Sequence, residues 1–409
     1  MIILEKSKNK KLKNNILSIG QAASKAKKEN PNVINSTSGM LFDENNKLYT
    51  FNSVKKAMNE LTYESMFKYS DTSGTQRFKD SIVSWIFGDK IYNFTSFYMG
   101  VVATPGGSGA IALTYSTYLN RGDKVLLPKV MWETYITYAE ERECSYLTYD
   151  IYDDCGKFNV QSIKEGIEKL DNQENVLLVI NDPCQNPTGF CMNDEDYDTL
   201  ISLLNSYKRN IVLLMDVAYF DYYSSNGEVV RNRFAKLSQL NDNVLTIFAF
   251  SGSKTFGLYG LRVGAAICLS RNEQEVTYFK NCYEYIARAS WSSVSTLGTS
   301  LIEELVLNEE YKELFREEVK FVSNLLKDRT SIFIEEAKKV NLQTLPYERG
   351  FFICIPTNDP VKLMEALKKD DVYVIVTKTC IRIALCAINK DEARRLPLII
   401  KNRMEIENL

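Results

Sequence analysis

Several residues that could bind an aldehyde and a phosphate lie close together after one apolar segment. Asn243 to Phe250 is typical of a buried strand. It is followed by Ser251, Ser253 and Lys254, and Arg262 lies eight residues beyond that lysine. A lysine amine can form a Schiff base with an aldehyde, while hydroxyls and a guanidinium can hold a phosphate. Pyridoxal phosphate carries both groups, which makes it the first cofactor to test.

A glycine-rich segment follows another predicted strand, Val101 to Thr104. Small residues such as Gly107 and Ser108 let backbone N–H groups approach an anion at the start of a helix. The spacing also fits a dinucleotide-binding fingerprint, and a merely tight turn is a further alternative, so the loop alone leaves all three open. Trp132 lies just beyond the next predicted strand, where it could stack on a planar ring or simply belong to the core.

Two more predicted strands end in polar residues. After Asn175 to Asn181, two prolines form a stiff turn that presents the amide of Asn186, although the turn could be purely structural. Asn210 to Met215 leads to Asp216, with Tyr219 shortly after it. Burying a carboxylate there is costly unless it meets a cation, and a protonated pyridine nitrogen is a suitable one. A magnesium-binding carboxylate is the rival interpretation, but it needs a phosphate-loop motif that the chain lacks.

The composition indicates a protein with a large core. The chain has 409 residues, 45% hydrophobic and 25% charged, which suits a division into two domains. Its 50 basic and 52 acidic residues nearly balance and give no support to a nucleic-acid or membrane partner. The nine cysteines form no CxxC pair, which favours reduced thiols. Without a signal-peptide pattern or an apolar run of transmembrane length, we expect a soluble cytoplasmic protein.

Histidine is absent from the sequence. This absence excludes Ser-His-Asp and Cys-His nucleophile systems, zinc sites with histidine ligands, and histidine general bases. Proton transfer must then come from Lys, Tyr, Cys or a carboxylate. The missing residue type therefore strengthens the case for a catalytic lysine.

From about residue 100, short apolar runs alternate with segments of helix length. Several runs are unbroken stretches of Val, Ile and Leu, as strands covered on both faces require. This alternation predicts a mostly parallel sheet with right-handed crossovers, in which ligands bind beyond the carboxyl ends of the strands. The predicted strands are Val101–Thr104, Lys124–Leu127, Asn175–Asn181, Asn210–Asp216, Asn243–Phe250 and Ala265–Leu269.

The C-terminal part of the chain has a different pattern. Residues 301 to 340 are typical of one or two long charged helices, and the strand-like runs Phe351–Ile355, Val372–Val376 and Ile381–Cys386 come after them. We expect residues 1–47 to form an N-terminal arm and part of a small domain. Residues 48–300 then form a large cofactor-binding domain, and residues 301–409 form the small α+β domain.

Together, the polar residues at the strand ends resemble a known family. The quoted motifs are Ser251-x-Ser253-Lys254 with Arg262, Asn186-Pro187-Thr188-Gly189, and Asp216-x-Ala218-Tyr219. From about Asn35 to Arg382 the chain is similar to class I pyridoxal-phosphate-dependent aminotransferases of the aspartate aminotransferase fold (fold type I). The resemblance implies an α/β large domain with a mostly parallel, seven-stranded sheet covered by helices, and a smaller α+β domain. It also implies ping-pong transfer of an amino group between an L-amino acid and a 2-oxo acid, in a homodimer with shared active sites.

The resemblance further implies roles for individual residues. Lys254 would hold the cofactor covalently and move a proton, Asp216 would pair with the pyridine nitrogen, and Trp132 would stack on the ring. Asn186 and Tyr219 would hydrogen-bond the 3′-oxygen of the cofactor. The phosphate would be held by Gly107, Ser108, Ser251, Ser253, Arg262 and, from a neighbouring subunit, Tyr69.

Substrate contacts follow from the same resemblance. Arg382 would bind the substrate α-carboxylate, with Gly39 allowing close approach of the backbone. Arg288 matches the arginine with which dicarboxylate-specific members bind a side-chain carboxylate across the dimer, so aspartate and glutamate are candidate substrates. The paired prolines of those members are replaced by Ser293 to Ser295, so an aromatic substrate and a surface role for Arg288 stay open. Tyr135 stands where many relatives carry a histidine that supports the aspartate.

Three alternatives stay open at this point. A lyase, decarboxylase or racemase could use the same cofactor and scaffold, because sequence does not show which substrate bond is held perpendicular to the ring. A ligand-sensing regulator usually carries a basic helix-turn-helix domain, whereas only about fifty residues precede the large-domain pattern here. A nicotinamide-dependent dehydrogenase would explain the glycine-rich loop but leave Lys254, Asp216 and Arg262 unexplained.

Overall fold

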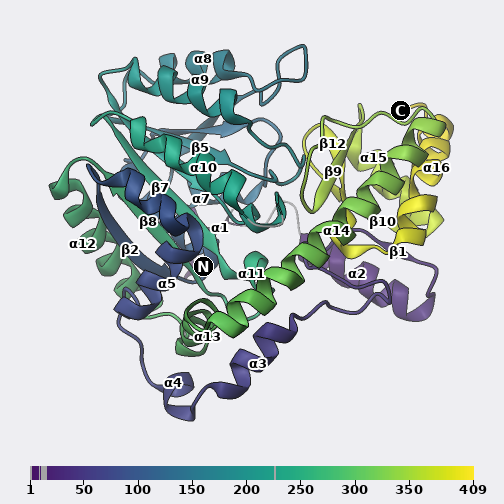
Figure 1. Ribbon diagram of the computed structural model, residues 1–409. Helices are drawn as coiled ribbons and strands as arrows, with labels where there is room; N and C mark the ends of the chain where they lie inside the picture. Colours follow the sequence, from purple (N-terminus) through teal and green to yellow (C-terminus); the bar gives the residue numbers. More distant parts are fainter. Residues whose placement is uncertain (1, 9, 11–15, 225–226) are drawn as a thin grey trace. The chain divides into compact units, whose positions relative to one another are not determined.

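The computed structural model describes residues 2–8, 10, 16–224 and 227–409, so part of the predicted N-terminal arm lies outside the described residues. The chain forms two compact units (Figure 1). The smaller unit comprises Met1–Lys47, Arg329–Thr344 and Ile353–Leu409, and the larger comprises Leu48–Asp328 and Leu345–Phe352. Among the described residues, no helix is both long enough and apolar enough to cross a membrane.

A seven-stranded sheet forms the centre of the larger unit, with strand order β2-β8-β7-β6-β5-β3-β4. Strand β8 is antiparallel to β2 and β7, while the other neighbouring pairs are parallel, so the prediction of a mostly parallel sheet is confirmed. The strands are β2 (Tyr98–Thr104), β3 (Lys124–Pro128), β4 (Ser145–Tyr149), β5 (Asn175–Asn181), β6 (Asn210–Asp216), β7 (Val244–Ser251) and β8 (Gly264–Ser270).

Helices surround this sheet in the larger unit. They include α3 (Asn52–Glu60), α4 (Tyr63–Phe67), α5 (Gln76–Phe87), α6 (Gly106–Tyr118), α7 (Thr134–Glu141), α8 (Val160–Glu168), α9 (Asp194–Asn205), α10 (Glu228–Lys236), α11 (Gly252–Thr255), α12 (Glu273–Ser290) and α13 (Thr296–Leu307). Helix α14 (Glu309–Lys339) has residues in both units.

The helices cover both faces of the sheet, which explains why its strands are continuous apolar runs. In β7, Leu245 and Ile247 belong to a core cluster shared with α6, α7 and α12. The intervening Phe248 packs edge-on against Phe87 of α5, with ring centres 5.1 Å apart. Successive side chains of a strand point to opposite faces, so a strand covered on both sides is apolar at every position.

Strand β4 is absent from the set of strands predicted from sequence. It lies at the edge of the sheet and pairs with β3 alone. Most of its side chains are exposed or half-buried, and Tyr149 is the buried one. An edge strand of this kind has no apolar run to reveal it, because only part of one face is covered.

The strand register brings the predicted polar strand ends to one edge of the sheet. Gly264, at the start of β8, pairs with Thr104 on one side and with Ser251 on the other. Asn181 at the end of β5 pairs with Asp216 at the end of β6. A Cβ atom on Gly264 would lie 2.3 Å from the Phe250 carbonyl oxygen, so only glycine permits this packing.

The smaller unit has its own sheets and helices. One three-stranded sheet has the order β11-β12-β9, and β1 pairs with β10 in parallel. The predicted strand Val372–Val376 is split, because its first part pairs with β1 and its second with β12. The elements are α1 (Glu5–Lys8), α2 (Ile16–Glu29), β1 (Ile34–Asn35), β9 (Phe352–Pro356), α15 (Pro360–Leu367), β10 (Val372–Tyr373), β11 (Ile375–Val376), β12 (Cys380–Ala384) and α16 (Lys390–Glu407).

A buried arginine ties the N-terminal segment to the C-terminal part of this unit. Arg329 is fully buried and donates to Glu44 Oε1 from Nε (2.9 Å) and Nη2 (2.7 Å). Its Nη2 also donates to the carbonyl of Phe42 (2.9 Å), and its Nη1 to those of Leu385 and Cys386 (3.3 Å each). These contacts hold residues 42–44 against the segment that follows β12.

Candidate active site

One end of the candidate site is a small cradle of glycines, hydroxyls and an arginine. Helix α6 begins at Gly106, so its first backbone N–H groups have no acceptor within the helix. Nη1 of Arg262 donates to the Ser253 hydroxyl at 2.8 Å. A Cβ atom on Gly106 would lie 2.8 Å from Nη2 of Arg262, and its φ of +72° also favours glycine. Such a cradle can hold a phosphate dianion.

Three further residues predicted to hold the phosphate lie at this end of the site. Gly107 faces Ser251 closely, because a Cβ atom on Gly107 would lie 3.4 Å from that of Ser251. Ser108 is half-buried in the first turn of α6. Burial raises the pKa of Tyr138 of α7, while the Ser108 side chain acts in the opposite direction. Tyr138 is not among the residues singled out from sequence.

Lys254 lies in the short helix α11 directly after β7, with its amine between two aromatic rings. Its Nζ atom is 5.7 Å from the ring centre of Tyr219 and 5.1 Å from that of Tyr259. The Tyr222 hydroxyl donates to the Lys254 carbonyl oxygen at 2.7 Å, which fixes the backbone of this helix. Lys254 is half-buried, so its amine is within reach of a small molecule.

Asp216 is a buried carboxylate whose two hydrogen-bond donors are neutral. The Tyr135 hydroxyl donates to Oδ2 at 2.5 Å, and the Ala218 amide donates to Oδ1 at 3.2 Å. Burial raises the pKa of Asp216, while both hydrogen bonds and the positive charge of Lys254 act in the opposite direction. Trp132 packs edge-on against Tyr135, with ring centres 5.4 Å apart. A buried carboxylate in this setting can stabilise a cation held next to it.

Asn186 is linked to Asp216 by a residue that sequence reasoning missed. Asn181, the last residue of β5, is buried and donates from Nδ2 to the Asp216 carbonyl oxygen at 2.8 Å. Its Oδ1 accepts from the backbone N–H of Asn186, also at 2.8 Å. The peptide bonds before Pro183 and Pro187 in this turn are cis. The position of Asn181 at a strand end was the signal that could have identified it.

Four of the residues predicted for the site do not lie with the others in the larger unit. Tyr69 is 94% exposed. Arg288 is also at the surface, where Nη1 donates to the Ser292 hydroxyl at 2.7 Å. Arg382 and Gly39 belong to the smaller unit, where Nη2 of Arg382 donates to the Thr37 carbonyl oxygen at 2.8 Å.

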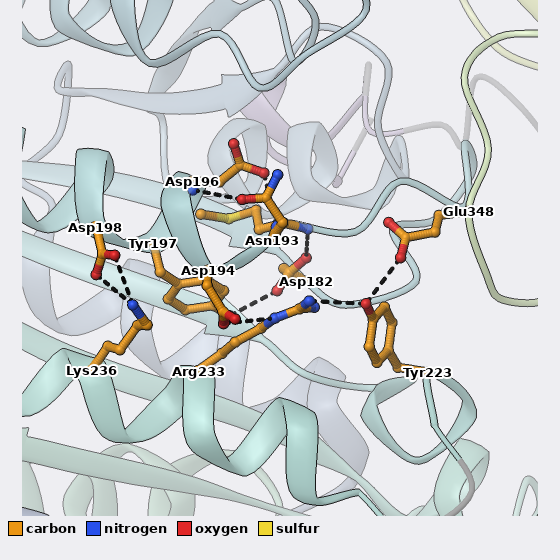
Figure 2. Close-up of polar contacts among 11 residues, drawn as sticks. Asp182, Asn193, Asp194, Asp196, Tyr197, Asp198, Tyr223, Arg233, Lys236 and Glu348 are labelled. Atoms are coloured by element: carbon orange, nitrogen blue, oxygen red, sulfur yellow. Dashed lines mark hydrogen bonds and ion pairs between the residues drawn. The ribbon is translucent and has the colours of Figure 1, made fainter.

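A polar network supports the turn that carries Asn186 (Figure 2). Asp182 is fully buried and accepts from the Met192 amide and the Tyr197 hydroxyl, both at 2.7 Å. Arg233 of α10 donates to Asp194 and to the Tyr223 hydroxyl, which in turn donates to Glu348. Burial raises the pKa of Asp182 to about 7, although its two hydrogen bonds oppose the rise.

We expect Asp182→Asn to stabilise the protein increasingly as pH rises from about 4 to about 7. Over this range the folded state keeps the Asp182 proton that the unfolded state loses, so this carboxyl lowers the free energy of unfolding with rising pH. The difference between its ordinary pKa of 3.8 and about 7 corresponds to at most about 4 kcal/mol. Urea midpoints at pH 5 and pH 8 for both proteins test this, and a constant difference between them would contradict it.

Comparison with known proteins shows which proteins this chain is similar to. A family model described as "Aminotransferase class I and II" matches residues 31–397. The chain is 23% identical to the mitochondrial aspartate aminotransferase of Xenopus tropicalis, over 82% of this chain and 79% of that protein. It is 27% identical to an aromatic-amino-acid aminotransferase of Pseudomonas aeruginosa, over 53% of each. A solved aminotransferase structure from Anaerococcus prevotii has a TM-score of 0.93 and 28% identity, and the match covers 98% of this chain and 99% of that one.

Proposed function

The chain belongs to the class I and II aminotransferases, and we propose that its larger unit binds pyridoxal phosphate with Lys254 as the attachment point. As a member of this family the protein is a transaminase, which uses this cofactor to transfer amino groups. The observation that carries our proposal is the meeting of three features at one sheet edge. They are the Lys254 amine, the buried carboxylate of Asp216 and the cradle formed by Gly106, Ser253 and Arg262.

The residues present fit the cofactor at each of its ends. The glycine at position 106 leaves open a space beside Arg262 that a Cβ atom would fill, which suits a phosphate. The Asp216 carboxylate is buried and accepts from two neutral groups, the Tyr135 hydroxyl and the Ala218 amide, which suits a pyridinium as its partner. Lys254 provides a half-buried amine for the aldehyde. The distribution of charge therefore matches a molecule with an anionic end and a cationic end.

When bound, pyridoxal phosphate supplies an electron-withdrawing ring that makes the hydrogen on the substrate Cα acidic. Lys254 would move that proton between the substrate Cα and the cofactor, because its amine is free once substrate has arrived. Asp216 would keep a proton on the pyridine nitrogen. Asn186 and Tyr219 would donate to the 3′-oxygen, and Trp132 would stack on the ring. The Ser251 hydroxyl and the N–H groups of Gly107 and Ser108 would join the phosphate cradle.

The substrates are an amino acid and a 2-oxo acid, which use the same site in turn by a ping-pong mechanism. We assign Arg382 to the α-carboxylate that the two share, with Gly39 beside it. One relative is named for aspartate and another for aromatic amino acids, and these names support either an acidic or an aromatic side chain on the substrate. Arg288, an exposed arginine held by Ser292, would bind the second carboxylate of aspartate or glutamate.

An assay of amino donors with 2-oxoglutarate as the common acceptor tests the function, and Arg288→Ala tests the assignment of the second carboxylate. We expect the wild-type protein to convert the cofactor to its amino form with an amino acid and back with a 2-oxo acid. Arg288→Ala should weaken kcat/KM for aspartate by about 10–100-fold, as losing a charge-assisted pair does, and leave aromatic donors nearly unchanged. Equal losses for both classes would contradict the role of Arg288. Release of ammonia or carbon dioxide without return of the amino group would contradict transamination.

We also propose that the enzyme is a cytoplasmic homodimer in which Tyr69 reaches the phosphate of the partner's site. The larger unit exposes several large aromatic side chains, which commonly mark a protein–protein interface. Tyr63, Phe67 and Tyr69 lie within or just after α4 and are 78%, 76% and 94% exposed, and Tyr285 of α12 is 79% exposed. The stacked rings of Tyr63 and Phe67 form one apolar surface.

A further inference from the structure

A hollow of about 530 Å³ lies beside strand β2, at the outer edge of the large sheet. Helices α5 and α12 lie next to this strand (Figure 1). We infer that this hollow, the edge groove, binds an extended acidic segment of a partner protein, which adds a strand to β2. Its lining includes Met99 and Val101 of β2, Lys280 of α12, and residues of α5 and of the 3₁₀ helix Gly88–Phe94. None of the lining residues belongs to the proposed cofactor site, so the inference goes beyond the proposed function and does not rest on it.

The side of β2 that faces the groove has main-chain groups open to an added strand. Strand β2 pairs with β8 on one side, and no strand in the described part of the chain pairs with its other side. The Ala103 backbone N–H donates to the Ser73 carbonyl oxygen at 2.9 Å, so the polar groups of Ala103 point away from β8. Because main-chain direction alternates along a strand, Met99 and Val101 direct their N–H and C=O groups to this same side. Among the residues that the structure describes, these groups have no hydrogen-bond partner.

The open edge has room for about four residues of an added strand. It runs from Tyr98, where β2 begins, to Val101, because the Ser73 carbonyl occupies the edge at Ala103. At about 3.3 Å per residue, a segment of this length spans roughly 13 Å. Main-chain hydrogen bonds to such an edge provide affinity for any extended peptide, and the side chains next to the edge then decide which peptide binds.

The charged side chains of the groove favour a negatively charged peptide. Lys280 is exposed and forms no hydrogen bond or salt bridge with any residue that the structure describes. Lys79 of α5 is half-buried, and its Nζ donates to the Ser73 hydroxyl at 2.9 Å. Asp80 is the acidic residue of the lining, and its Oδ1 accepts from Nε2 of Gln76 at 2.8 Å. With two lysines and one aspartate, the groove has a net positive charge that complements carboxylates.

Other parts of the lining are apolar, which favours a peptide over a simple inorganic anion. Val83 and Ile91 line the groove together with Tyr92, whose ring is 78% exposed. Alternate side chains of an added strand point to opposite faces, so a peptide in which apolar and acidic residues alternate suits this lining. Lysines on an edge strand commonly prevent pairing between sheets, whereas Lys79 and Lys280 come from helices and leave the edge of β2 open.

The test measures binding of a defined peptide to the wild-type holoenzyme by isothermal titration calorimetry. The probe is acetyl-Val-Glu-Val-Asp-Val-amide, whose two ends carry no charge. We expect a dissociation constant of about 100 µM, because the cost of ordering a short peptide offsets much of what its contacts contribute. Lys280→Glu should weaken binding at least about tenfold, since like charges then face each other. Lys208→Glu is the matched control, because Lys208 is an exposed lysine of the same unit outside the groove, and it should bind as the wild type does.

Two modified peptides test whether the probe binds as a strand. Each carries N-methyl groups on alternate amides, and the two sets of methylated amides are complementary. In an added strand only one of these sets of N–H groups faces β2. We therefore expect one modified peptide to bind at least about tenfold more weakly than the probe and the other to keep most of the affinity. Transaminase kcat should be the same in the wild type, Lys280→Glu and Lys208→Glu, because neither lysine belongs to the cofactor site.

Several results would overturn the inference. One is a wild-type holoenzyme that does not bind the acidic peptide. Another is equal binding of both methylated peptides and the probe, because the main chain of β2 would then take no part. Equal losses in Lys280→Glu and Lys208→Glu would show that the peptide responds only to the overall charge. Concentration-dependent association of the wild type that Lys280→Glu abolishes would mean that a second copy of the chain covers this edge, which also contradicts the inference.

Discussion

Lys254→Ala is expected to lose amino-group transfer almost completely, with kcat lower by several orders of magnitude. The lysine has two roles, as the point of covalent attachment and as the base that moves the proton, and alanine can perform neither. We expect the phosphate cradle to be kept, because the substitution leaves in place Ser253 and Arg262, which form a 2.8 Å hydrogen bond in the wild-type protein. The variant should therefore still bind pyridoxal phosphate without forming the covalent linkage. Single-turnover assays and equilibrium dialysis measure the two effects separately.

Lys236→Ala is the matched control for this loss. Lys236 lies in the same unit, in the last turn of α10, and pairs with Asp198 at 2.7 Å on the surface (Figure 2). Breaking a surface ion pair has little effect on stability, so this variant should keep the wild-type turnover and the covalent linkage. Transamination by Lys254→Ala at the wild-type rate would show that another amine carries the reaction.

Asp216→Asn is expected to lower kcat at least about 100-fold, the size of effect typical of a single preorganised charge. An amide can still accept the Tyr135 hydrogen bond, so the packing around position 216 is retained. It cannot hold a proton on the pyridine nitrogen, and the ring then withdraws electrons from the substrate less strongly. Steady-state kinetics should show the loss mainly in kcat, because Arg262 and Ser253 at the phosphate end are unchanged.

Asp221→Asn controls for the burial of a carboxylate in the same unit. Asp221 is 5% exposed and accepts from Nε1 of Trp85 at 3.3 Å. As with Asp216, burial raises the pKa of Asp221, in this case to about 6. It has no part in the proposed site, so its replacement should leave kcat unchanged. Similar losses of kcat in both variants would mean that Asp216 acts through stability and not through the cofactor.

Much of the large sheet could be predicted from sequence because its strands are buried on both faces. Strands β5 and β6 have the predicted bounds, Asn175–Asn181 and Asn210–Asp216, since each is an unbroken apolar run that ends in a polar residue. Strand β4 could not be predicted, because an edge strand with exposed side chains lacks that pattern. The division of Val372–Val376 into two strands could not be predicted either, because an apolar run does not show which neighbouring strand each half pairs with.

Some residues of the candidate site could likewise be predicted from sequence, and others could not. Lys254, Asp216 and Arg262 could be singled out because a charged group beside a buried strand needs a partner. Asn181 also lies at a strand end, but its role depends on which distant residues it meets, and the sequence does not show that. Asn181 joins Asp216 to the turn of Asn186 only through the pairing of β5 with β6. A sequence pattern records the type of residue and its spacing, but not such long-range contacts.

The most direct test of the central claim is to locate the covalent linkage between the cofactor and the protein. Borohydride reduces a Schiff base to a stable amine, so treatment of the holoenzyme followed by peptide mass mapping identifies the lysine that carries the cofactor. We predict the added mass of reduced pyridoxal phosphate on the peptide that contains Lys254. Cofactor found on a different lysine, or a cofactor-loaded protein in which Lys254 remains unmodified, would contradict the account.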